Sequence, residues 1–217
     1  MITSCIFDLD GVIVDTAKYH YLAWKRLANE LNFEFTELQS ELTKGISRMA
    51  SLEIILEIGG MTSLFSDTEK EAMASQKNTW YLEYVNKMST DELLPGVKFF
   101  LKELQETNIK IILGSASKNA RVILDRCHIL HLFDAIVDGN MVSKAKPDPE
   151  VFILGANMLE ELPENCIVFE DAQAGIEAAS RAKMRSVGVG GSPTLLKANM
   201  QLETFENFHF TDLLLID

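Results

Sequence analysis

From residue 94 onward, short apolar runs alternate with segments of helical periodicity, and this alternation restricts the fold more than any other feature. Strands are expected at 109–113, 135–137, 166–169 and 186–189, and helices at 97–106, 119–127, 149–159 and 174–182. Strands that alternate with helices form parallel sheets with helices on both faces. A further apolar run at 2–7 predicts one more strand, so the fold class is α/β.

Residues 17–87 show helical periodicity without strand-like runs. Trp24, Leu27 and Leu31 recur at three- and four-residue spacing, which is typical of an amphipathic helix. The run Ser66–Glu69 has the form of a capping box and predicts the start of another helix. We therefore expect a Rossmann-like parallel core, residues 1–16 and 88–217, with a small all-helical cap domain, residues 17–87, inserted after the first strand.

One stripe of that last helix carries a lysine among large side chains: Met73, Lys77, Trp80 and Tyr84. Such a lysine either extends to solvent along its aliphatic stem or lies on a face that lines a cleft.

Polar residues follow four of the expected strands. They are Asp8–Gly11, Gly114–Asn119, Ser143–Pro147 in the loop after 135–137, and Glu170–Asp171. Each group alone is explained by a helix cap, a turn or a solvated loop. In parallel sheets, however, ligands bind at the carboxyl ends of the strands, so these groups are expected around one crevice.

The chemistry of these groups indicates a phosphoryl-transfer site. Several carboxylates in one crevice repel each other unless a cation is bound, and hard oxygen ligands favour Mg²⁺. Asp8 is placed to act as a nucleophile and Asp10 as a general acid or base. Ser115 and a lysine would balance the phosphate charge. Lys144 and Lys146 are both candidates, and the adjacent Pro147 favours Lys146.

These residues resemble the haloacid dehalogenase-like superfamily over essentially the whole chain. The resemblance rests on Asp8-Leu9-Asp10-Gly11-Val12, Ser115, Lys146-Pro147 and Glu170-Asp171-Ala172-Gln173-Ala174-Gly175. It implies that Asp8 becomes phosphorylated and that Mg²⁺ is held by Asp8, the Asp10 backbone carbonyl, Glu170 and Asp171. Asp8, Asp10, Ser115 and Lys146 are the implied catalytic residues.

Finer motifs resemble the beta-phosphoglucomutase family, isomerases of carbohydrate metabolism. They are Asp15-Thr16 with His20 and Trp24, Lys44-Gly45-Ile46-Ser47-Arg48, Lys77-Asn78 and Ser115–Asn119. The implied substrate-binding residues are Thr16, His20, Trp24, Gly45, Arg48, Lys77, Ser115, Ala116, Ser117, Lys118, Asn119 and Lys146. The alternatives stay open: Arg48 as a surface residue, and Thr16 with His20 as a hinge cap and a satisfied histidine.

The resemblance implies conversion of β-D-glucose 1-phosphate to glucose 6-phosphate through β-glucose 1,6-bisphosphate. A Mg²⁺-dependent sugar-phosphate phosphatase with the same core is the alternative. A non-catalytic binding protein is disfavoured because Asp8, Asp10, Lys146, Glu170 and Asp171 are all present.

The composition limits the partners. A formal net charge of −12 repels nucleic acid and anionic membranes. No apolar stretch has the roughly 20 residues of a membrane span, and the N-terminus lacks the basic start of a signal peptide. The three separated cysteines, without a CxxC, favour reduced thiols and a cytoplasmic location. The resemblance suggests a monomer.

Overall fold

The computed structural model describes residues 1–43, 46–191, 195 and 197–216, and the chain divides into two compact units. The core unit comprises Met1–Asp15 and Met88–Asp217, and the helical unit comprises Thr16–Lys87. The sequence-based division differs by one residue, Thr16, which lies at the N-cap of the first helix. Gly45 of the expected substrate-binding set, and Lys44 of the motif that contains it, lie outside the described residues.

The core unit contains a six-stranded sheet in the order β3-β2-β1-β4-β5-β6, and every neighbouring pair is parallel. The strands are β1 (Ser4–Phe7), β2 (Lys110–Gly114), β3 (Ala135–Val137), β4 (Cys166–Glu170), β5 (Arg185–Val189) and β6 (Met200–Leu202). The predicted parallel sheet is confirmed. β6 was not expected from the sequence because it is a short, partly exposed edge strand without an apolar run.

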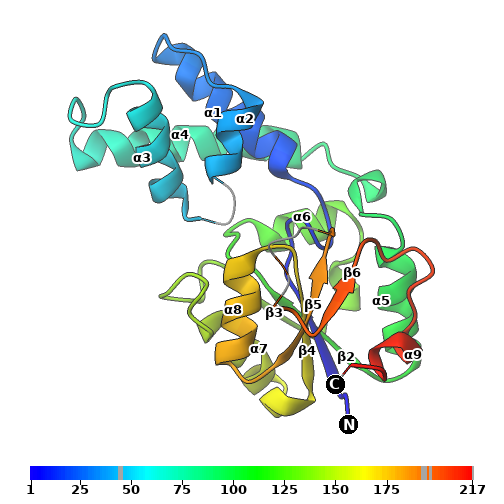
Figure 1. Ribbon diagram of the computed structural model, residues 1–217. Helices are drawn as coiled ribbons and strands as arrows, with labels where there is room; N and C mark the ends of the chain where they lie inside the picture. Colours follow the sequence, from blue (N-terminus) through cyan, green and yellow to red (C-terminus); the bar gives the residue numbers. More distant parts are fainter. Residues whose placement is uncertain (44–45, 192–194, 196, 217) are drawn as a thin grey trace. The chain divides into compact units, whose positions relative to one another are not determined.

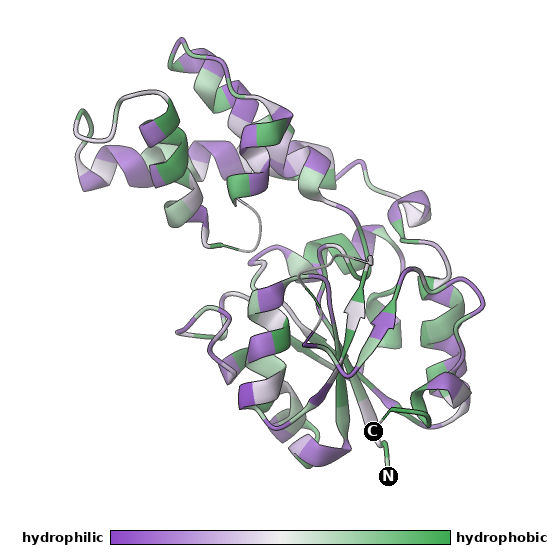
Figure 2. Ribbon diagram, in the orientation of Figure 1, coloured by the Kyte–Doolittle hydropathy of each residue, from purple (hydrophilic) through white to green (hydrophobic). Residues whose placement is uncertain are grey.

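Helices cover both faces of this sheet (Figure 1). The core-unit helices are α5 (Val97–Glu106), α6 (Ala120–Arg126), α7 (Glu150–Met158), α8 (Gln173–Arg181) and α9 (Phe210–Leu213), with 3₁₀ turns η2 (Thr90–Glu92), η3 (Leu130–Leu132) and η4 (Pro163–Asn165). On one face, side chains of α7 and α8 pack with Ile6, Ile112 and Val168. In Figure 2, green predominates on the strands in the middle of the sheet, whereas the edge strand β6 includes a purple segment. Burial on both faces explains their continuous apolar runs.

The opposite face is built from aromatic side chains. Phe7 and Phe169, on neighbouring strands, stack with ring centroids 4.6 Å apart. Phe100 of α5 meets Phe169 edge-on, with the centroids 5.6 Å apart. Phe205 packs on both strand residues, so the C-terminal segment closes this side of the core.

The helical unit contains α1 (Ala17–Glu30), α2 (Glu37–Ser40), η1 (Glu41–Thr43), α3 (Arg48–Ile58) and α4 (Asp67–Val85). The capping box predicted at Ser66 and Glu69 is present and begins α4. The stripe expected on α4 is only partly buried. Lys77 and Trp80 are buried, but the inward face continues through Ala74, Tyr81 and Val85 rather than through Met73 and Tyr84, which are half-buried. Within the described residues, no helix is both long enough and apolar enough to cross a bilayer.

Candidate functional site

The register of the three central strands brings polar groups to one edge of the sheet. Phe7 of β1 pairs with Leu113 of β2 on one side and with Phe169 of β4 on the other. The next residue on each strand is therefore at the same level, and the backbone N–H of Asp8 donates to the Phe169 carbonyl at 3.0 Å. Asp8 thus lies between Gly114 and Glu170 at the carboxyl ends of the strands, where parallel sheets bind ligands.

Lys146 reaches this edge from the loop before α7. Its Nζ donates to Asp8 Oδ1 and to Glu170 Oε1, each at 2.6 Å, and to the Gly114 carbonyl at 3.0 Å. Burial disfavours the charged ammonium, but the two carboxylates outweigh it and raise the pKa of Lys146. The other sequence candidate, Lys144, has a side chain that is 70% exposed and pairs with Asp148 instead.

Three carboxylates converge here. Oxygen atoms of Asp8, Glu170 and Asp171 lie within 4.8 Å of one another. Burial, followed by the charge of Asp8, raises the pKa of Glu170 to about 7 despite the neighbouring Lys146. Burial, followed by the charges of Asp8, Glu170 and Asp10, raises the pKa of Asp171 to about 8. The site thus holds more negative charge than one lysine can balance.

That imbalance fits a divalent metal ion. Among the described residues, Asp8, Glu170 and Asp171 are the group of three potential ligands close enough to share one ion. The donors are all oxygen, which suits hard cations. The structure therefore contains an acidic cluster that can hold a metal ion.

Two glycines make room for these carboxylates. A Cβ on Gly11 would lie 2.0 Å from Asp171 Oδ2, and the φ of +76° at Gly11 is one that other residues rarely adopt. A Cβ on Gly175, in the first turn of α8, would lie 1.9 Å from Glu170 Cδ. The glycines after the two acidic pairs thus allow backbone and carboxyl groups to approach closely.

In the segment after β2, two side-chain hydroxyls each accept a hydrogen bond from the backbone N–H two residues further along the chain. Ser115 is 1% exposed, and its hydroxyl accepts from the Ser117 N–H at 3.1 Å. The Ser117 hydroxyl accepts from the Asn119 N–H at 3.3 Å. This segment, residues 115–119, contains Ala116 and the exposed Lys118 and ends where α6 begins. The hydroxyls of Ser115 and Ser117 and the exposed ammonium of Lys118 are groups of the type that binds phosphate.

A neighbouring loop holds this segment in place. The Gly139 N–H donates to the Ser117 carbonyl at 3.2 Å, and the Asn140 side chain donates to the Lys118 carbonyl at 3.1 Å. Sequence reasoning missed both supporting residues. The turn-forming run Asp138-Gly139-Asn140 directly after a strand was the available signal.

The helical unit has its own polar cluster, around Lys77. The Lys77 side chain is 2% exposed, so the alternative in which it extends to solvent is wrong. Its Nζ donates to His20 Nδ1 at 2.8 Å and lies 4.5 Å from the centre of the Trp24 ring and 5.0 Å from that of Tyr81. Burial, and then the positive charges of Lys77 and Arg48, lower the pKa of His20 well below its usual value. A neutral His20 can accept this hydrogen bond.

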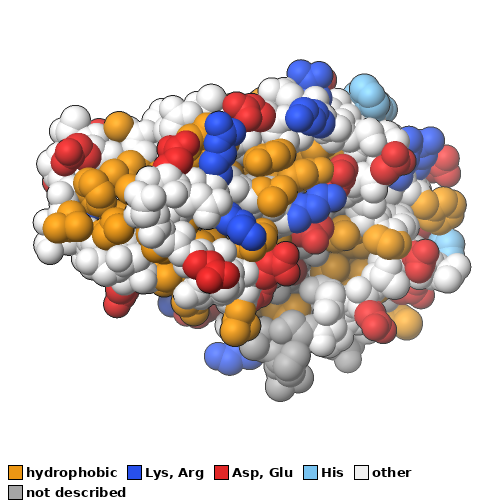
Figure 3. Space-filling view, turned by 90° about the horizontal axis from the view of Figure 1, so that it is seen from above, with side chains coloured by type: hydrophobic (Ala, Val, Ile, Leu, Met, Phe, Trp, Pro, Cys, Tyr) orange, Lys and Arg blue, Asp and Glu red, His pale blue; other side chains and the backbone are white. Residues whose placement is uncertain are grey.

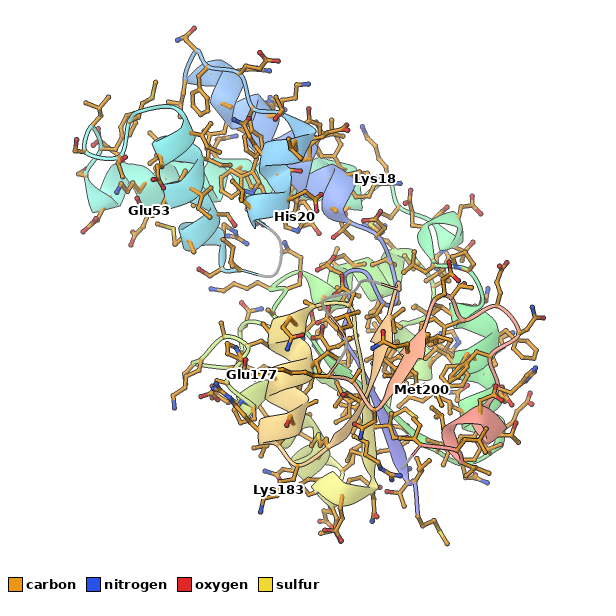
Figure 4. All side chains as sticks on the ribbon, in the orientation of Figure 1. Lys18, His20, Glu53, Glu177, Lys183 and Met200 are labelled. Atoms are coloured by element: carbon orange, nitrogen blue, oxygen red, sulfur yellow. The ribbon has the colours of Figure 1, made fainter. Side chains whose placement is uncertain are left out.

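Arg48 begins α3 and is half-buried, and its Nη2 donates to the Asn78 side chain at 2.8 Å. Thr16 is buried at the start of α1, and its carbonyl accepts from the His20 N–H at 3.1 Å. His20 is labelled on α1 in Figure 4.

The described candidate residues thus form two sets. Those of the core unit are Asp8, Asp10, Ser115, Ala116, Ser117, Lys118, Asn119, Lys146, Glu170 and Asp171, and those of the helical unit are Thr16, His20, Trp24, Arg48 and Lys77.

The chain is similar to known proteins in sequence and in fold. Residues 5–189 match the haloacid dehalogenase-like hydrolase family. The chain is 45% identical over 197 residues to a beta-phosphoglucomutase of Bacillus subtilis, an alignment that covers 91% of this chain and 87% of that protein. A crystal structure of beta-phosphoglucomutase from Clostridium difficile matches with a TM-score of 0.92 and 43% identity, covering 99% of this chain and 96% of that one.

A phosphorylated carbohydrates phosphatase of Thermotoga maritima is 30% identical over 190 residues, which is 85% of this chain and 83% of that protein.

Proposed function

This chain belongs to the haloacid dehalogenase-like hydrolase family, and from that premise we propose that it is an isomerase with beta-phosphoglucomutase activity. It interconverts β-D-glucose 1-phosphate and glucose 6-phosphate through β-glucose 1,6-bisphosphate. The observation that carries the proposal is the 45% identity to a beta-phosphoglucomutase. The ammonium of Lys146, 2.6 Å from an oxygen of Asp8 and of Glu170 and beside a third carboxylate, supports phosphoryl transfer at the end of the sheet.

Asp8 is the nucleophile of the proposed reaction. One carboxylate oxygen attacks a phosphorus of the bisphosphate, a bond forms between that oxygen and phosphorus, and the bond from phosphorus to the sugar oxygen breaks. The carboxyl proton of Asp10 passes to the departing sugar oxygen. The products are an aspartyl phosphate and a sugar monophosphate.

The second half of the reaction reverses these roles. Transfer of the 1-phosphate to Asp8 leaves glucose 6-phosphate, which departs, and β-glucose 1-phosphate then binds with its free 6-hydroxyl at the aspartyl phosphate. Asp10 takes the proton from this hydroxyl, its oxygen bonds to the phosphorus, and the bond from phosphorus to Asp8 breaks. The products are β-glucose 1,6-bisphosphate and the free Asp8 carboxylate, and the bisphosphate turns end for end before the next transfer.

The remaining core residues are assigned roles in balancing the negative charge of the transferring phosphate. Asp8, Glu170, Asp171 and the Asp10 carbonyl would hold Mg²⁺, which when bound supplies positive charge beside the transferring phosphate. Lys146 and the Ser115 hydroxyl contact the oxygens of that phosphate. The hydrogen bond that Ser115 accepts from the Ser117 N–H orients its hydroxyl.

A mutase also needs to bind a second phosphate. We assign this phosphate to Arg48, whose guanidinium suits bidentate binding, and to Ser117, Lys118 and Asn119 with the Ala116 backbone. Trp24 and Lys77 lie near the sugar in this proposal, Thr16 and His20 influence Asp10, and Gly45 contributes backbone to the substrate site. The helical unit acts as the cap domain, which excludes water while the aspartyl phosphate persists.

The alternative is a sugar-phosphate phosphatase, because the same core centre would serve if water attacked the aspartyl phosphate. The relative from Thermotoga maritima is a phosphatase of phosphorylated carbohydrates. A hydrolase needs no second phosphate site, so Arg48 and residues 117–119 favour the mutase.

The test is incubation with β-glucose 1-phosphate, Mg²⁺ and a trace of β-glucose 1,6-bisphosphate. We expect glucose 6-phosphate as the main product, measured with a coupled dehydrogenase. Inorganic phosphate that accumulates in step with substrate loss would identify a phosphatase instead.

We further propose that the enzyme acts as a monomer in the cytoplasm, on small sugar phosphates and without nucleic acid or membrane partners. The net charge of −12 supports this choice of partners. On the face drawn in Figure 3, acidic and basic side chains are intermixed rather than separated by sign.

A further inference from the structure

We propose that Glu150 is a positioning residue that closes the loop carrying Lys146 and so fixes the Lys146 ammonium against Asp8 and Glu170. The inference rests on the proposed function, because it assigns Glu150 a role in phosphoryl transfer through Lys146.

Glu150 is the first residue of α7, and its carboxylate faces back along the chain to the start of the loop. Oε2 accepts from the N–H of Lys144 at 2.8 Å and from the N–H of Ser143 at 3.0 Å. The Ser143 hydroxyl donates to the same carboxylate, at 3.1 and 3.2 Å from its two oxygens. One side chain therefore joins the two ends of the segment 143–150.

Asp148 supports the loop from inside. Its Oδ1 accepts from the Glu150 N–H at 3.1 Å, and its own N–H donates to the Ala145 carbonyl at 3.0 Å. The hydrogen bonds of Glu150 and Asp148 thus fix both ends of the segment from which Lys146 extends.

The position of Lys146 matters because its ammonium binds two carboxylates and a carbonyl at once. The Lys146 side chain is 9% exposed. A displacement of about 1 Å in such a group can slow a reaction by about 100-fold. The hydrogen bond from the Lys144 N–H, and further hydrogen bonds from Ser143, lower the pKa of Glu150. The Glu150 carboxylate is therefore charged near neutral pH, which strengthens these hydrogen bonds.

A simpler role for Glu150 is a favourable negative charge at the N-terminus of α7. Two substitutions separate the roles. Glu150→Gln loses the charge but keeps one carbonyl oxygen for the two N–H groups and an amide that can donate to the Ser143 hydroxyl. Glu150→Ala loses both the charge and the hydrogen bonds.

The control is Glu177→Ala. Glu177 is a half-buried residue of α8, labelled in Figure 4, and its side chain pairs with Arg181 on the same helix.

Steady-state kinetics, run well below the melting temperature of every variant, give the first readout. We expect Glu150→Ala to lower kcat by about 10- to 100-fold, with the KM for β-glucose 1-phosphate changed by less than about threefold. Glu150→Gln should keep kcat within about fivefold of the parent protein, and Glu177→Ala should match the parent. A charge effect alone would make the alanine and glutamine variants equal, and would overturn the proposal.

Acylation of lysines by an N-hydroxysuccinimide ester, followed by mass spectrometry, gives a readout that needs no activity. Lys146 should react slowly in the parent protein and at least about fivefold faster in Glu150→Ala, relative to the exposed Lys183. Glu150→Gln should behave as the parent does. An unchanged Lys146 rate in Glu150→Ala overturns the proposal, as does a faster rate with unchanged kcat.

The two proposals fail in different ways. If the parent protein is inactive as a mutase, the proposed function fails, while the acylation rates still show whether Glu150 positions Lys146.

Discussion

Asp8, Glu170 and Asp171 would repel one another if all three were charged and only Lys146 opposed them. In the metal-free protein the raised pKa values of Glu170, about 7, and Asp171, about 8, relieve that repulsion by retaining protons. The same pKa values determine how strongly a cation binds, because the ion has to displace those protons.

Magnesium binding is therefore expected to strengthen as the pH rises. Near pH 6 both Glu170 and Asp171 hold protons, and above about pH 8 both are ionised. Each proton that Mg²⁺ displaces makes the apparent affinity about tenfold stronger per pH unit. Titration calorimetry should show a dissociation constant at least about tenfold lower near pH 8 than near pH 6. A constant affinity across this range would contradict the assignment of these ligands.

The stability of the metal-free protein should change in the opposite sense. Both carboxyls have folded pKa values above their unfolded ones, so they stabilise the folded state most below about pH 4. That contribution is lost as the pH rises through 7 to 8. Added Mg²⁺ should therefore raise the melting temperature more at pH 8 than at pH 6.

Asp10→Asn should separate proton transfer from metal binding. Asparagine keeps the shape of the side chain but cannot supply or take the sugar proton, so kcat should fall by about 10²- to 10⁴-fold. Mg²⁺ affinity should not weaken, because the Asp10 carboxylate is one of the charges that raise the pKa of Asp171. Calorimetry on the same sample checks this, and an unchanged kcat would remove Asp10 from the mechanism.

At the scale of elements, the candidate site residues are positioned by loops whose backbone groups are hydrogen-bonded to neighbouring residues. The loop after β3 supports residues 115–119, and Glu150 closes the loop before α7. Each loop is anchored at the end of a parallel strand or at the start of a helix. The positions of the polar side chains therefore depend on small shifts of these loops.

Gly139→Ala should disturb the first of these loops. A Cβ there would lie 2.1 Å from the Ala116 carbonyl oxygen, and backbone atoms cannot move aside as a flexible side chain can. We expect residues 115–119 to shift and kcat/KM for β-glucose 1-phosphate to fall by about 100-fold.

Gly155→Ala in α7 is the control for this variant. Its Cβ would lie 2.8 Å from a methyl group of Ile112, a side chain that can adjust. It should change the melting temperature but leave kcat/KM within about threefold. Equal losses of kcat/KM in the two variants would mean that the loop after β3 has no particular effect on the site.

The sequence predicted those features that follow from periodicity and from parallel topology. Buried strands read as apolar runs, and the acids Asp8 and Glu170 were expected to meet because their strands end at the same edge. β6 and the four-residue α9 were missed because each is too short to show a period. Glu150 was missed because its partners are backbone N–H groups, which no residue pattern marks.

At the scale of the whole molecule, two compact units carry separate sets of candidate residues. The core unit contains the proposed nucleophile Asp8 and the carboxylates proposed to bind the metal ion. The helical unit contributes Arg48 and the buried Lys77. A reaction that needs only the core set should therefore be insensitive to changes in the helical unit.

Arg48→Ala tests this separation. Mutase turnover should fall by at least about 100-fold, because the guanidinium no longer binds the second phosphate. Hydrolysis of acetyl phosphate, which has no second phosphate, should stay within about threefold of the parent rate.

Arg26→Ala in α1 serves as the control for Arg48. Arg26 lies 4.4 Å from the centre of the Trp80 ring and pairs with Glu83. Arg26→Ala should leave mutase turnover and acetyl phosphate hydrolysis nearly unchanged. Equal losses of mutase turnover and acetyl phosphate hydrolysis in Arg48→Ala would show that Arg48 does not bind the second phosphate.

The chain leaves the core unit after Asp15 and re-enters it at Met88. Val14 forms an antiparallel bridge with Leu93, and the Leu94 N–H donates to the Ile13 carbonyl at 3.0 Å. The segment that leaves the core unit and the segment that returns to it are therefore hydrogen-bonded to each other within the core unit. A different domain could therefore be grafted between these two positions without interrupting any strand. Evolution can in this way vary what such a catalyst recognises while inheriting its chemistry unchanged.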